Sequence, residues 1–154
     1  MESKKDKLKP KHPHFGKPLL CAEGNCLKFY MMKVSFDFDG TLSRIDVQEF
    51  AKTLIDDGLD VWICTSRLCS ENAPNKEWND DLFKVANELG IPKSKVIFTN
   101  HEDKAEHLTD DFIWHLDDDW IELNEINRKR KTVGVSVFGN SLWKQKCLKI
   151  LNCT

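Results

Sequence analysis

Five short runs of apolar and β-branched residues recur along the chain from residue 33 onward. The runs are nearly continuous rather than alternating, which is typical of strands that are covered on both faces. They comprise residues 33–36, 60–64, 96–99, 112–116 and 133–138. The pattern therefore predicts five buried strands.

The segments between these runs have the apolar spacing of amphipathic helices. The first stripe covers residues 47–54, and we expect Asp46 to cap this helix, with Glu49 completing the cap and Gly58 ending the helix. Further helices are expected at 82–89, closed by Gly90 and Pro92, at 103–108, at 120–126, and at 143–151, capped by Asn140 or Ser141.

Strands that alternate with helices predict an α/β fold. We expect a three-layer, Rossmann-like arrangement, in which helices cover both faces of a central parallel sheet of about five strands. In such sheets ligands bind beyond the carboxyl ends of the strands, where the strand order reverses. The polar clusters of this chain follow the apolar runs, so we expect a single site at that edge.

The first run ends in Asp37-Phe38-Asp39-Gly40-Thr41. Asp37 and Asp39 lie two residues apart, so on an extended chain both would point to one face. Two such carboxylates repel each other unless a cation lies between them or one keeps its proton, and either state suits phosphoryl chemistry. Gly40 permits a tight turn close to a ligand, to which Thr41 offers a hydroxyl and an N–H.

This stretch resembles the first signature motif of the haloacid-dehalogenase-like (HAD) hydrolase superfamily, an apolar strand followed by Asp-x-Asp-Gly-Thr. The resemblance extends over residues 33–151 and implies a HAD-like fold. The second motif is a strand that ends in Thr or Ser, which Thr65 matches, and Arg67 is similar to an arginine of polynucleotide phosphatases in this group. As an alternative, Thr65 or Ser66 caps a helix.

The third motif of the superfamily is a lysine before the fourth strand, and Lys104 occupies that place. Its ammonium would neutralise charge on the nucleophile and on the phosphoryl group. Lys93 and Lys95 are alternatives, but they precede the third strand. A solvated surface lysine is the other interpretation of Lys104.

The fourth motif is an apolar strand that ends in paired acids. Asp117 and Asp118 match it, with Asp119 as an alternative register. Three consecutive aspartates repel each other unless a cation is present, and helix capping accounts for one of them at most. By resemblance, Asp118 is the first choice as a magnesium ligand and Asp117 the second.

The resemblance implies a magnesium-dependent phosphatase that forms an aspartyl-phosphate. Asp37 would attack phosphorus, and Asp39 would protonate the leaving oxygen and then activate water. The carboxylates of Asp37 and Asp118 and the backbone carbonyl of Asp39 would bind Mg²⁺. Thr65 and Lys104 would hold the charge of the transferring group. The further substrate contacts would be Gly40, Thr41, Ser66 and Arg67.

Members of this superfamily insert a cap after the first motif or after the third strand. Residues 42–60 and 99–112 leave little room beyond a single helix in each place. The resemblance therefore implies a capless, open site, suited to a nucleotide, a nucleic-acid end or a phosphoprotein. Arg67 could contact a phosphate there, and Trp78 could stack on a base, although a core role for Trp78 is an equal alternative.

The composition limits the classes of protein to consider. A chain of 154 residues with 40% hydrophobic and 31% charged residues and a net charge of −2 forms one ordinary domain, and it neither requires nor excludes nucleic acid. No apolar run approaches the roughly 18 residues of a membrane span, so no membrane partner is expected. The scattered cysteines, with Cys64 and Cys147 expected to be buried and reduced, are typical of a cytoplasmic protein.

Residues 1–31 differ from the rest, because they are rich in lysine and proline and poor in large apolar residues. We expect a flexible, basic N-terminal arm there, which could bind nucleic acid, and a catalytic domain over residues 32–154. A zinc site is an alternative for the arm, although the spacing is not that of a standard finger; its ligands would be His12, His14, Cys21 and Cys26.

A module that binds phosphate or nucleic acid with little turnover is the alternative to an enzyme. The complete set of acids in the first and fourth motifs favours the enzyme. Salt-dependent binding to DNA or RNA that survives the loss of Asp37 would instead favour the binding module.

Overall fold

Each of the five apolar runs forms a strand of one parallel sheet. The computed structural model describes residues 32–154, and the strands are β1 (Lys33–Phe36), β2 (Asp60–Thr65), β3 (Val96–Phe98), β4 (Phe112–Asp117) and β5 (Val133–Ser136). Their order in the sheet is β3-β2-β1-β4-β5, and every neighbouring pair is parallel. The predicted fold class, an α/β Rossmann-like fold with a five-stranded parallel sheet, is confirmed.

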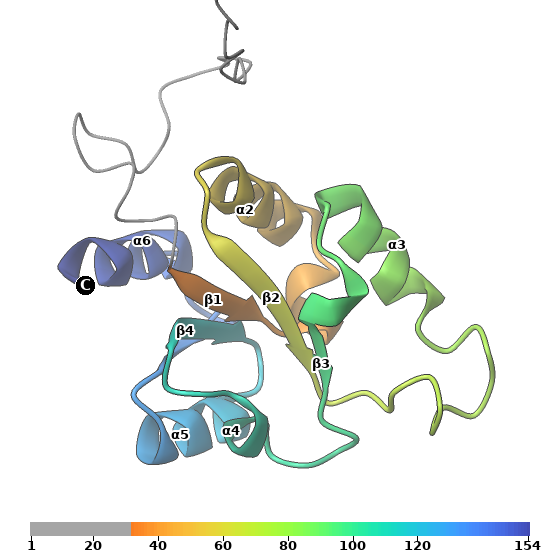
Figure 1. Ribbon diagram of the computed structural model, residues 1–154. Helices are drawn as coiled ribbons and strands as arrows, with labels where there is room; N and C mark the ends of the chain where they lie inside the picture. The colour runs from red at the N-terminus through yellow and green to blue at the C-terminus, as the bar shows by residue number, and fades with distance from the viewer. Residues whose placement is uncertain (1–31) are drawn as a thin grey trace, which may run out of the picture.

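Helices cover both faces of this sheet (Figure 1). The helical elements are η1 (Phe38–Leu42), α2 (Ile45–Asp56), α3 (Asp80–Leu89), η2 (Lys93–Lys95), α4 (Lys104–His107), α5 (Trp120–Lys129) and α6 (Trp143–Cys153). Figure 1 shows α2, α3 and α6 on one side of the sheet and α4 and α5 on the other. The arrangement therefore has the three predicted layers.

The two faces of the sheet are packed unequally. The larger apolar core lies under α2, α3 and α6, and the smaller one lies under α4 and α5 around Phe112 and Ile126. In the larger core the Phe36 ring meets the Trp114 ring edge to face at 5.2 Å, a geometry that aromatic pairs prefer. Phe36 immediately precedes Asp37, so this contact fixes the ends of β1 and β4 beside each other.

The connections that follow β1 and β3 are short. Between Leu42 and Asp60 the chain forms α2, and between Phe98 and Phe112 it forms α4.

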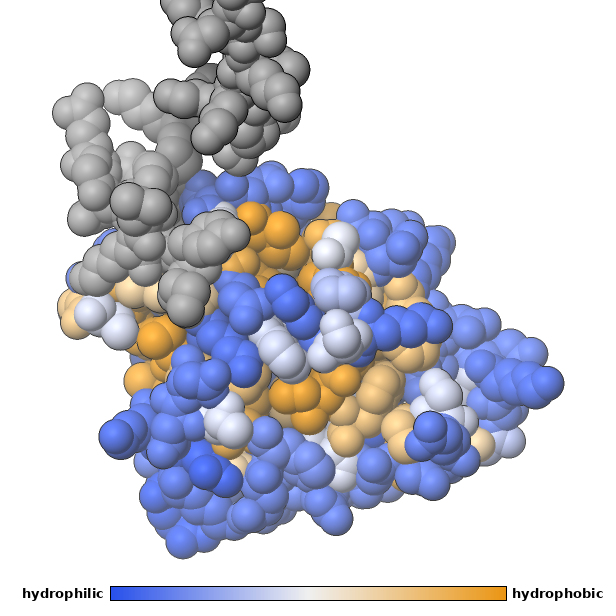
Figure 2. Space-filling model, viewed as in Figure 1, coloured by the Kyte–Doolittle hydropathy of each residue, from blue (hydrophilic) through white to orange (hydrophobic). Residues whose placement is uncertain are grey.

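Figure 2 shows the face viewed in Figure 1, where apolar residues reach the surface in the middle, at the edge strand β3, with hydrophilic residues around them. Consistent with this view, all three residues of β3 are half-buried.

Gly90 ends α3 as predicted, but the polar N-caps predicted for α2 and α6 are not observed. Gly90 takes a left-handed φ of 76° at the C-cap of α3, a conformation that glycine adopts without strain. The prediction that Asp46 caps α2 is wrong, because the helix begins at Ile45 and Asp46 instead accepts hydrogen bonds from the Arg44 guanidinium.

The predicted cap of the last helix is also wrong. The N-cap of α6 is Leu142, which makes no side-chain capping hydrogen bond. The Asn140 side chain accepts a hydrogen bond from the Leu142 N–H one position too early to cap the helix. In both cases the error concerns a helix end, where one residue of displacement changes the partner.

The predictions for residues 1–31 lie outside the described residues. They include the flexible arm, its binding to nucleic acid, and zinc binding by His12, His14, Cys21 and Cys26. Within residues 32–154, no helix is both long and apolar enough to cross a membrane. Cys64 and Cys147 are buried and carry free thiols, as expected.

Candidate active site

Three strand ends bring the predicted site residues together. β1 lies between β2 and β4 in the sheet, and the chain leaves β1 toward one neighbour and returns later on the other side. This is a topological switch point, where parallel sheets bind ligands. Asp37 follows β1, Thr65 ends β2 and Asp117 ends β4.

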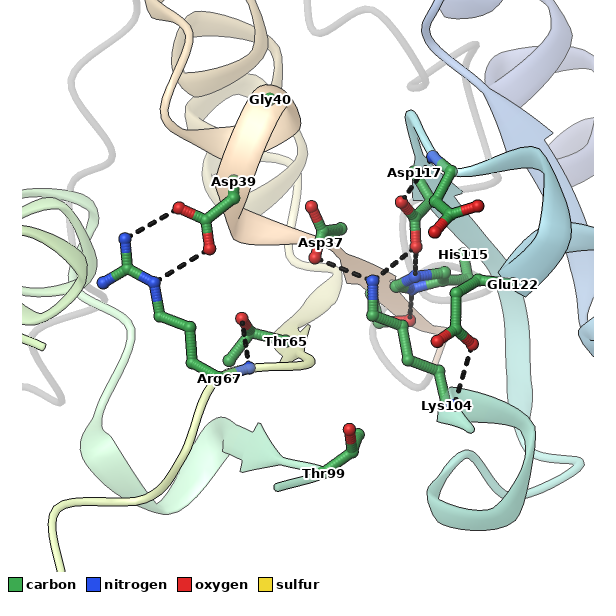
Figure 3. Close-up of polar contacts among 12 residues, drawn as sticks. Asp37, Asp39, Gly40, Thr65, Arg67, Thr99, Lys104, His115, Asp117 and Glu122 are labelled. Carbon is green, nitrogen blue, oxygen red and sulfur yellow. Dashed lines mark hydrogen bonds and ion pairs between the residues drawn. The ribbon is translucent and has the colours of Figure 1, made fainter. Parts of the chain in front are cut away.

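A buried lysine links the acids of β1 and β4 (Figure 3). The Lys104 Nζ lies 2.8 Å from Asp37 Oδ1 and 2.6 Å from Asp117 Oδ2. All three residues are buried, with exposed fractions of 2% for Lys104, 5% for Asp37 and 0% for Asp117. Of the three lysines considered from the sequence, Lys104 is the one at the site.

The alternatives Lys93 and Lys95 lie at the opposite edge of the sheet. They form η2, which precedes β3, so they lie near the amino end of the strand. Lys95 makes an ion pair with Asp60 at 2.7 Å, at the start of β2. The Lys93 ammonium lies over the Phe83 ring.

The pKa values of Asp37 and Asp117 are shifted in opposite directions. Desolvation raises the pKa of Asp37, and the nearby charge of Asp117 adds to this effect, while Lys104 opposes it. Burial alone would also raise the pKa of Asp117, but hydrogen bonds from His115 and Lys104 hold that pKa well below its usual range. Asp117 is thus kept ionised, whereas the ionised form of Asp37 is favoured by Lys104 and disfavoured by burial and by the charge of Asp117.

Asp118 joins these two acids in an oxygen cluster. One carboxylate oxygen each from Asp37, Asp117 and Asp118 lies within 4.8 Å of the others. Asp118 is the exposed member of the set, and burial followed by the charge of Asp117 raises its pKa. Three carboxylates arranged in this way present the hard oxygen ligands that Mg²⁺ binds.

Position 40 requires a glycine because the backbone there lies close to this cluster. Its φ is +73°, and a Cβ at this position would lie 2.4 Å from Asp118 Oδ2. Any other residue would therefore both strain the backbone and collide with Asp118. The turn predicted at Gly40 is present, and it brings the backbone directly against the Asp118 carboxylate.

Asp119 has a separate role. Its Oδ1 accepts a hydrogen bond from the Ile121 N–H at 2.8 Å and thereby caps α5. The three consecutive aspartates are thus divided between two acids at the strand end and one helix cap. The alternative register with Asp119 in the cluster does not fit this structure.

Asp39 does not share a face with Asp37. Because β1 ends at Phe36 and residues 38–42 form a turn, the extended spacing expected from the sequence does not apply. Figure 3 shows the Asp39 carboxylate directed toward Arg67 and the Asp37 carboxylate toward Lys104. The exposed Asp39 side chain accepts hydrogen bonds from Arg67 Nε and Nη2 at 2.8 and 2.7 Å.

All five N–H donors of the Arg67 guanidinium are used within the protein. Besides Asp39, the guanidinium donates to both carboxylate oxygens of Asp81, at 2.7 and 2.9 Å, and to the Trp78 carbonyl at 3.2 Å. A phosphate could be bound by Arg67 only if one of these partners were displaced. The substrate contact expected of Arg67 therefore stays a prediction, and its observed role is to hold Asp39.

The remaining predicted contacts differ in accessibility. The Thr65 hydroxyl accepts a hydrogen bond from the Arg67 N–H at 3.3 Å, which leaves its own proton available, and no helix begins at Thr65 or Ser66. Ser66 is half-buried. Thr41 is fully buried, and its hydroxyl has no hydrogen-bond partner among the described residues. A ligand contact by the Thr41 hydroxyl is thus also still a prediction.

Two polar residues of the site were missed from the sequence. His115 is fully buried and donates toward Asp117 from β4, and Glu122 on α5 accepts a hydrogen bond from the Lys104 backbone N–H at 3.0 Å. His115 interrupts an apolar run two residues before Asp117, so the two side chains share one face of the strand. That spacing was a usable signal, whereas Glu122 had none.

Comparison with known proteins finds a structural likeness at low sequence identity. No model of a protein family matches the chain, and no curated protein sequence matches it. Among solved structures, the chain is similar to the "putative 3-deoxy-D-manno-octulosonate 8-phosphate phosphatase from Vibrio cholerae", with a TM-score of 0.45, 15% sequence identity, and coverage of 84% of this chain and 89% of the other.

Proposed function

We propose that this protein is a magnesium-dependent phosphatase, a phosphoric monoester hydrolase that acts through an aspartyl-phosphate on Asp37. The observation that carries the proposal is the buried contact of Asp37 with Lys104, at 2.8 Å, beside the oxygen cluster of Asp117 and Asp118. A structural ion pair would need neither the exposed third acid nor a glycine packed directly against it. The HAD-like, capless resemblance of the sequence supports the same assignment.

Two displacements at phosphorus account for hydrolysis. A carboxylate oxygen of Asp37 forms a bond to phosphorus while the bond to the leaving oxygen breaks, and Asp39 gives its proton to that oxygen. A water oxygen then attacks the same phosphorus, its proton passes to Asp39, and the bond to Asp37 breaks to release phosphate. Lys104 and the Thr65 hydroxyl hold the negative charge of the transferring group in both steps.

The position of Asp39 adds a requirement to this mechanism. Its carboxylate is held by Arg67 in the structure, directed away from Asp37 (Figure 3). Asp39 must turn from Arg67 toward the leaving oxygen to act as the acid. We infer that the bound substrate brings about this rotation, with Arg67 then released to contact the phosphate or its neighbouring group.

The donor set fits Mg²⁺. Asp37 and Asp118 would hold the ion through carboxylates and Asp39 through its backbone carbonyl, with Asp117 as the second choice, because the Asp117 carboxylate already accepts from Lys104, His115 and the Asp119 N–H. When bound, the ion would supply charge neutralisation for the phosphoryl group and for Asp37. Asp118 is exposed and is not engaged by Lys104 or His115, so its carboxylate is accessible to a cation.

Asp118→Ala should weaken magnesium activation far more than Asp119→Ala does. The first change removes a ligand of the oxygen cluster, which is expected to raise the Mg²⁺ concentration for half-maximal activity by about 10-fold to 100-fold. The second change removes the cap of α5 and should cost about 1 kcal/mol of stability instead. Activity titrated with Mg²⁺, together with urea unfolding, separates the two effects.

The opposite order would contradict this assignment of the ligands. If Asp119→Ala raised the Mg²⁺ requirement more than Asp118→Ala, the cation would be bound by Asp119 and not by the cluster described above. Ca²⁺ is expected to inhibit both the wild type and the Asp119 variant, because its larger and looser coordination shell would misplace Asp37.

The open edge of the sheet favours a large phosphorylated substrate. The connections at the two positions where a cap would be inserted contain only the helices α2 and α4, which supports an open site over one that encloses a small sugar phosphate. Trp78 is 43% exposed, and its carbonyl accepts a hydrogen bond from Arg67. An exposed indole can stack on a base, and a guanidinium can contact a phosphate. We therefore propose a nucleotide, a nucleic-acid end or another macromolecular phosphate as substrate, in the cytoplasm.

A panel of phosphate monoesters tests this function. The panel comprises nucleotides, 5′- and 3′-phosphorylated oligonucleotides, phosphopeptides and hexose phosphates, each with Mg²⁺ and with a chelator. We expect Mg²⁺-dependent release of phosphate, with a higher kcat/KM on nucleotides or nucleic-acid ends than on hexose phosphates, and Trp78→Ala should narrow that difference. Hexose phosphate turnover equal to that of every nucleotide would contradict the substrate class, and no turnover of any ester would contradict the function.

A further inference from the structure

A buried chain of hydrogen bonds extends behind the site, from β1 to Asp117. The Ser35 hydroxyl lies 2.8 Å from His115 Nδ1, and His115 Nε2 lies 3.0 Å from Asp117 Oδ2. Ser35 and His115 are direct partners in the register of β1 and β4. Each of the three residues has an exposed fraction of 0%, so water does not interrupt the chain.

The chemistry of the partners determines which atom donates and which accepts in each of these hydrogen bonds. The Asp117 carboxylate lies 2.6 Å from the Lys104 ammonium and accepts from the Asp119 N–H, so it acts as an acceptor, and His115 Nε2 must carry the proton that is donated to it. Burial lowers the pKa of His115 itself. With the proton on Nε2, Nδ1 accepts the hydrogen of the Ser35 hydroxyl. The Asp117 carboxylate thus selects the Nε2–H tautomer, and the Ser35 hydroxyl adapts to it by donating to Nδ1.

Asp117 is held on both of its oxygens. Oδ2 accepts from His115 Nε2 and from Lys104 Nζ, and Oδ1 accepts from the Asp119 N–H at 2.9 Å. Donors on both sides leave the carboxylate little freedom to rotate. Lys104 depends on this fixed carboxylate, because the same Nζ must reach Asp37 on the other side.

We propose that His115, seated by Ser35, is a positioning residue that fixes the Asp117 carboxylate. It thereby holds Lys104 against Asp37 and keeps the oxygen cluster in a geometry that a divalent cation can occupy. His115 and Lys104 bond the same Asp117 oxygen and not each other, so the positioning effect of His115 is transmitted through Asp117. The expected effect on turnover rests on the proposed phosphatase function, whereas the orientation of His115 and Asp117 does not.

Two substitutions test the Nδ1 and Nε2 contacts of His115 separately. The amide of Asn has its nitrogen near the position of Nδ1, so His115→Asn keeps a group for Ser35 and loses the donor to Asp117. The amide of Gln reaches the position of Nε2, so His115→Gln keeps the donor to Asp117 and loses the contact with Ser35. His107→Asn is the surface control, since His107 pairs with the exposed Glu102 away from the cluster.

Mg²⁺ binding measured by calorimetry, Mg²⁺-activated turnover, and urea unfolding are compared across these variants. We expect His115→Asn to weaken Mg²⁺ binding by about 10-fold to 100-fold, as losses of groups behind a metal site do. His115→Gln should weaken it by less than about 3-fold, and His107→Asn should not change it. Equal Mg²⁺ affinity in the wild type and folded His115→Asn would overturn the proposal, as would equal losses in the Asn and Gln variants, which would indicate a purely structural histidine.

Nuclear magnetic resonance of ¹⁵N-labelled histidine tests the orientation independently of any activity. The metal-free wild type should show His115 as the Nε2–H tautomer with a slowly exchanging proton, and Ser35→Ala should shift the Nδ1 resonance. A proton on Nδ1 with a bare Nε2 would overturn the positioning role even in an active phosphatase. If the wild type neither binds Mg²⁺ nor hydrolyses any ester but shows the Nε2–H tautomer, the phosphatase function fails while the role of His115 toward Asp117 stands.

Discussion

Replacing Asp37 by Asn is expected to abolish hydrolysis of an aryl phosphate, with a loss in kcat on the order of 10⁴-fold or more. The amide nitrogen and oxygen occupy nearly the volume of the carboxylate, so the packing at the end of β1 is kept while the nucleophile is lost. Lys104 keeps Asp117 as a partner at 2.6 Å, and the fold should therefore remain intact. Steady-state kinetics and urea unfolding of the same preparation measure both consequences.

A surface aspartate provides the matched control for this change. Asp111 lies just before β4 and pairs with Lys33, with a side chain that is 61% exposed. Asp111→Asn removes the same charge and should leave kcat unchanged. Residual activity of Asp37→Asn near the wild-type level would remove Asp37 from its assigned role, whatever the control showed.

Replacing Lys104 by Met should cost both activity and stability. Met fills a similar volume but leaves the buried carboxylates of Asp37 and Asp117 facing each other without a cation. Breaking a buried ion pair on one side costs about 3–5 kcal/mol, which denaturant unfolding of the metal-free protein would measure. Turnover should also fall by about 100-fold or more, because the ammonium no longer stabilises the transferring group.

Lys95→Met is the control, since Lys95 makes an ion pair at the opposite edge of the sheet. That pair with Asp60 is partly exposed, at 37% for the lysine side chain, so its loss should cost less than about 1 kcal/mol and should not affect turnover. Equal stability of Lys104→Met and wild type in the absence of metal would contradict the buried network described above. A recovery of stability on adding Mg²⁺ is expected, because the ion takes over part of the neutralisation.

The sheet could be predicted from the sequence because its strands are buried on both faces. A run such as residues 60–64 has no polar face to confuse with a helix, and β2 was observed at Asp60–Thr65. The helix caps could not be predicted in the same way. Asp46 has the composition of a cap, but its carboxylate is engaged by Arg44, a contact that depends on the path of the chain before the helix.

The acids of the site could be predicted because each ends a strand, and parallel strands bring their carboxyl ends to one edge. Lys104 could be distinguished from Lys93 and Lys95 because it lies between the third and fourth strands, whereas they precede the third strand. The partners of the Arg67 guanidinium could not be predicted, because Asp81 lies 14 residues away on α3 and nothing in the local sequence indicates that the two side chains meet. The same applies to Asp39, whose direction depends on where β1 ends.

Trapping the phosphorylated enzyme during turnover tests the central claim most directly. The protein is mixed with a substrate from the panel that it hydrolyses, quenched with acid within the first turnovers, reduced with borohydride and digested, and the peptide that contains Asp37 is identified by mass spectrometry. We predict that Asp37 alone is recovered as homoserine, the product of reducing an aspartyl-phosphate, and that Asp37→Asn yields none. Wild-type turnover with an unmodified Asp37 peptide at every quench time, or with the modification at another residue, would contradict the account.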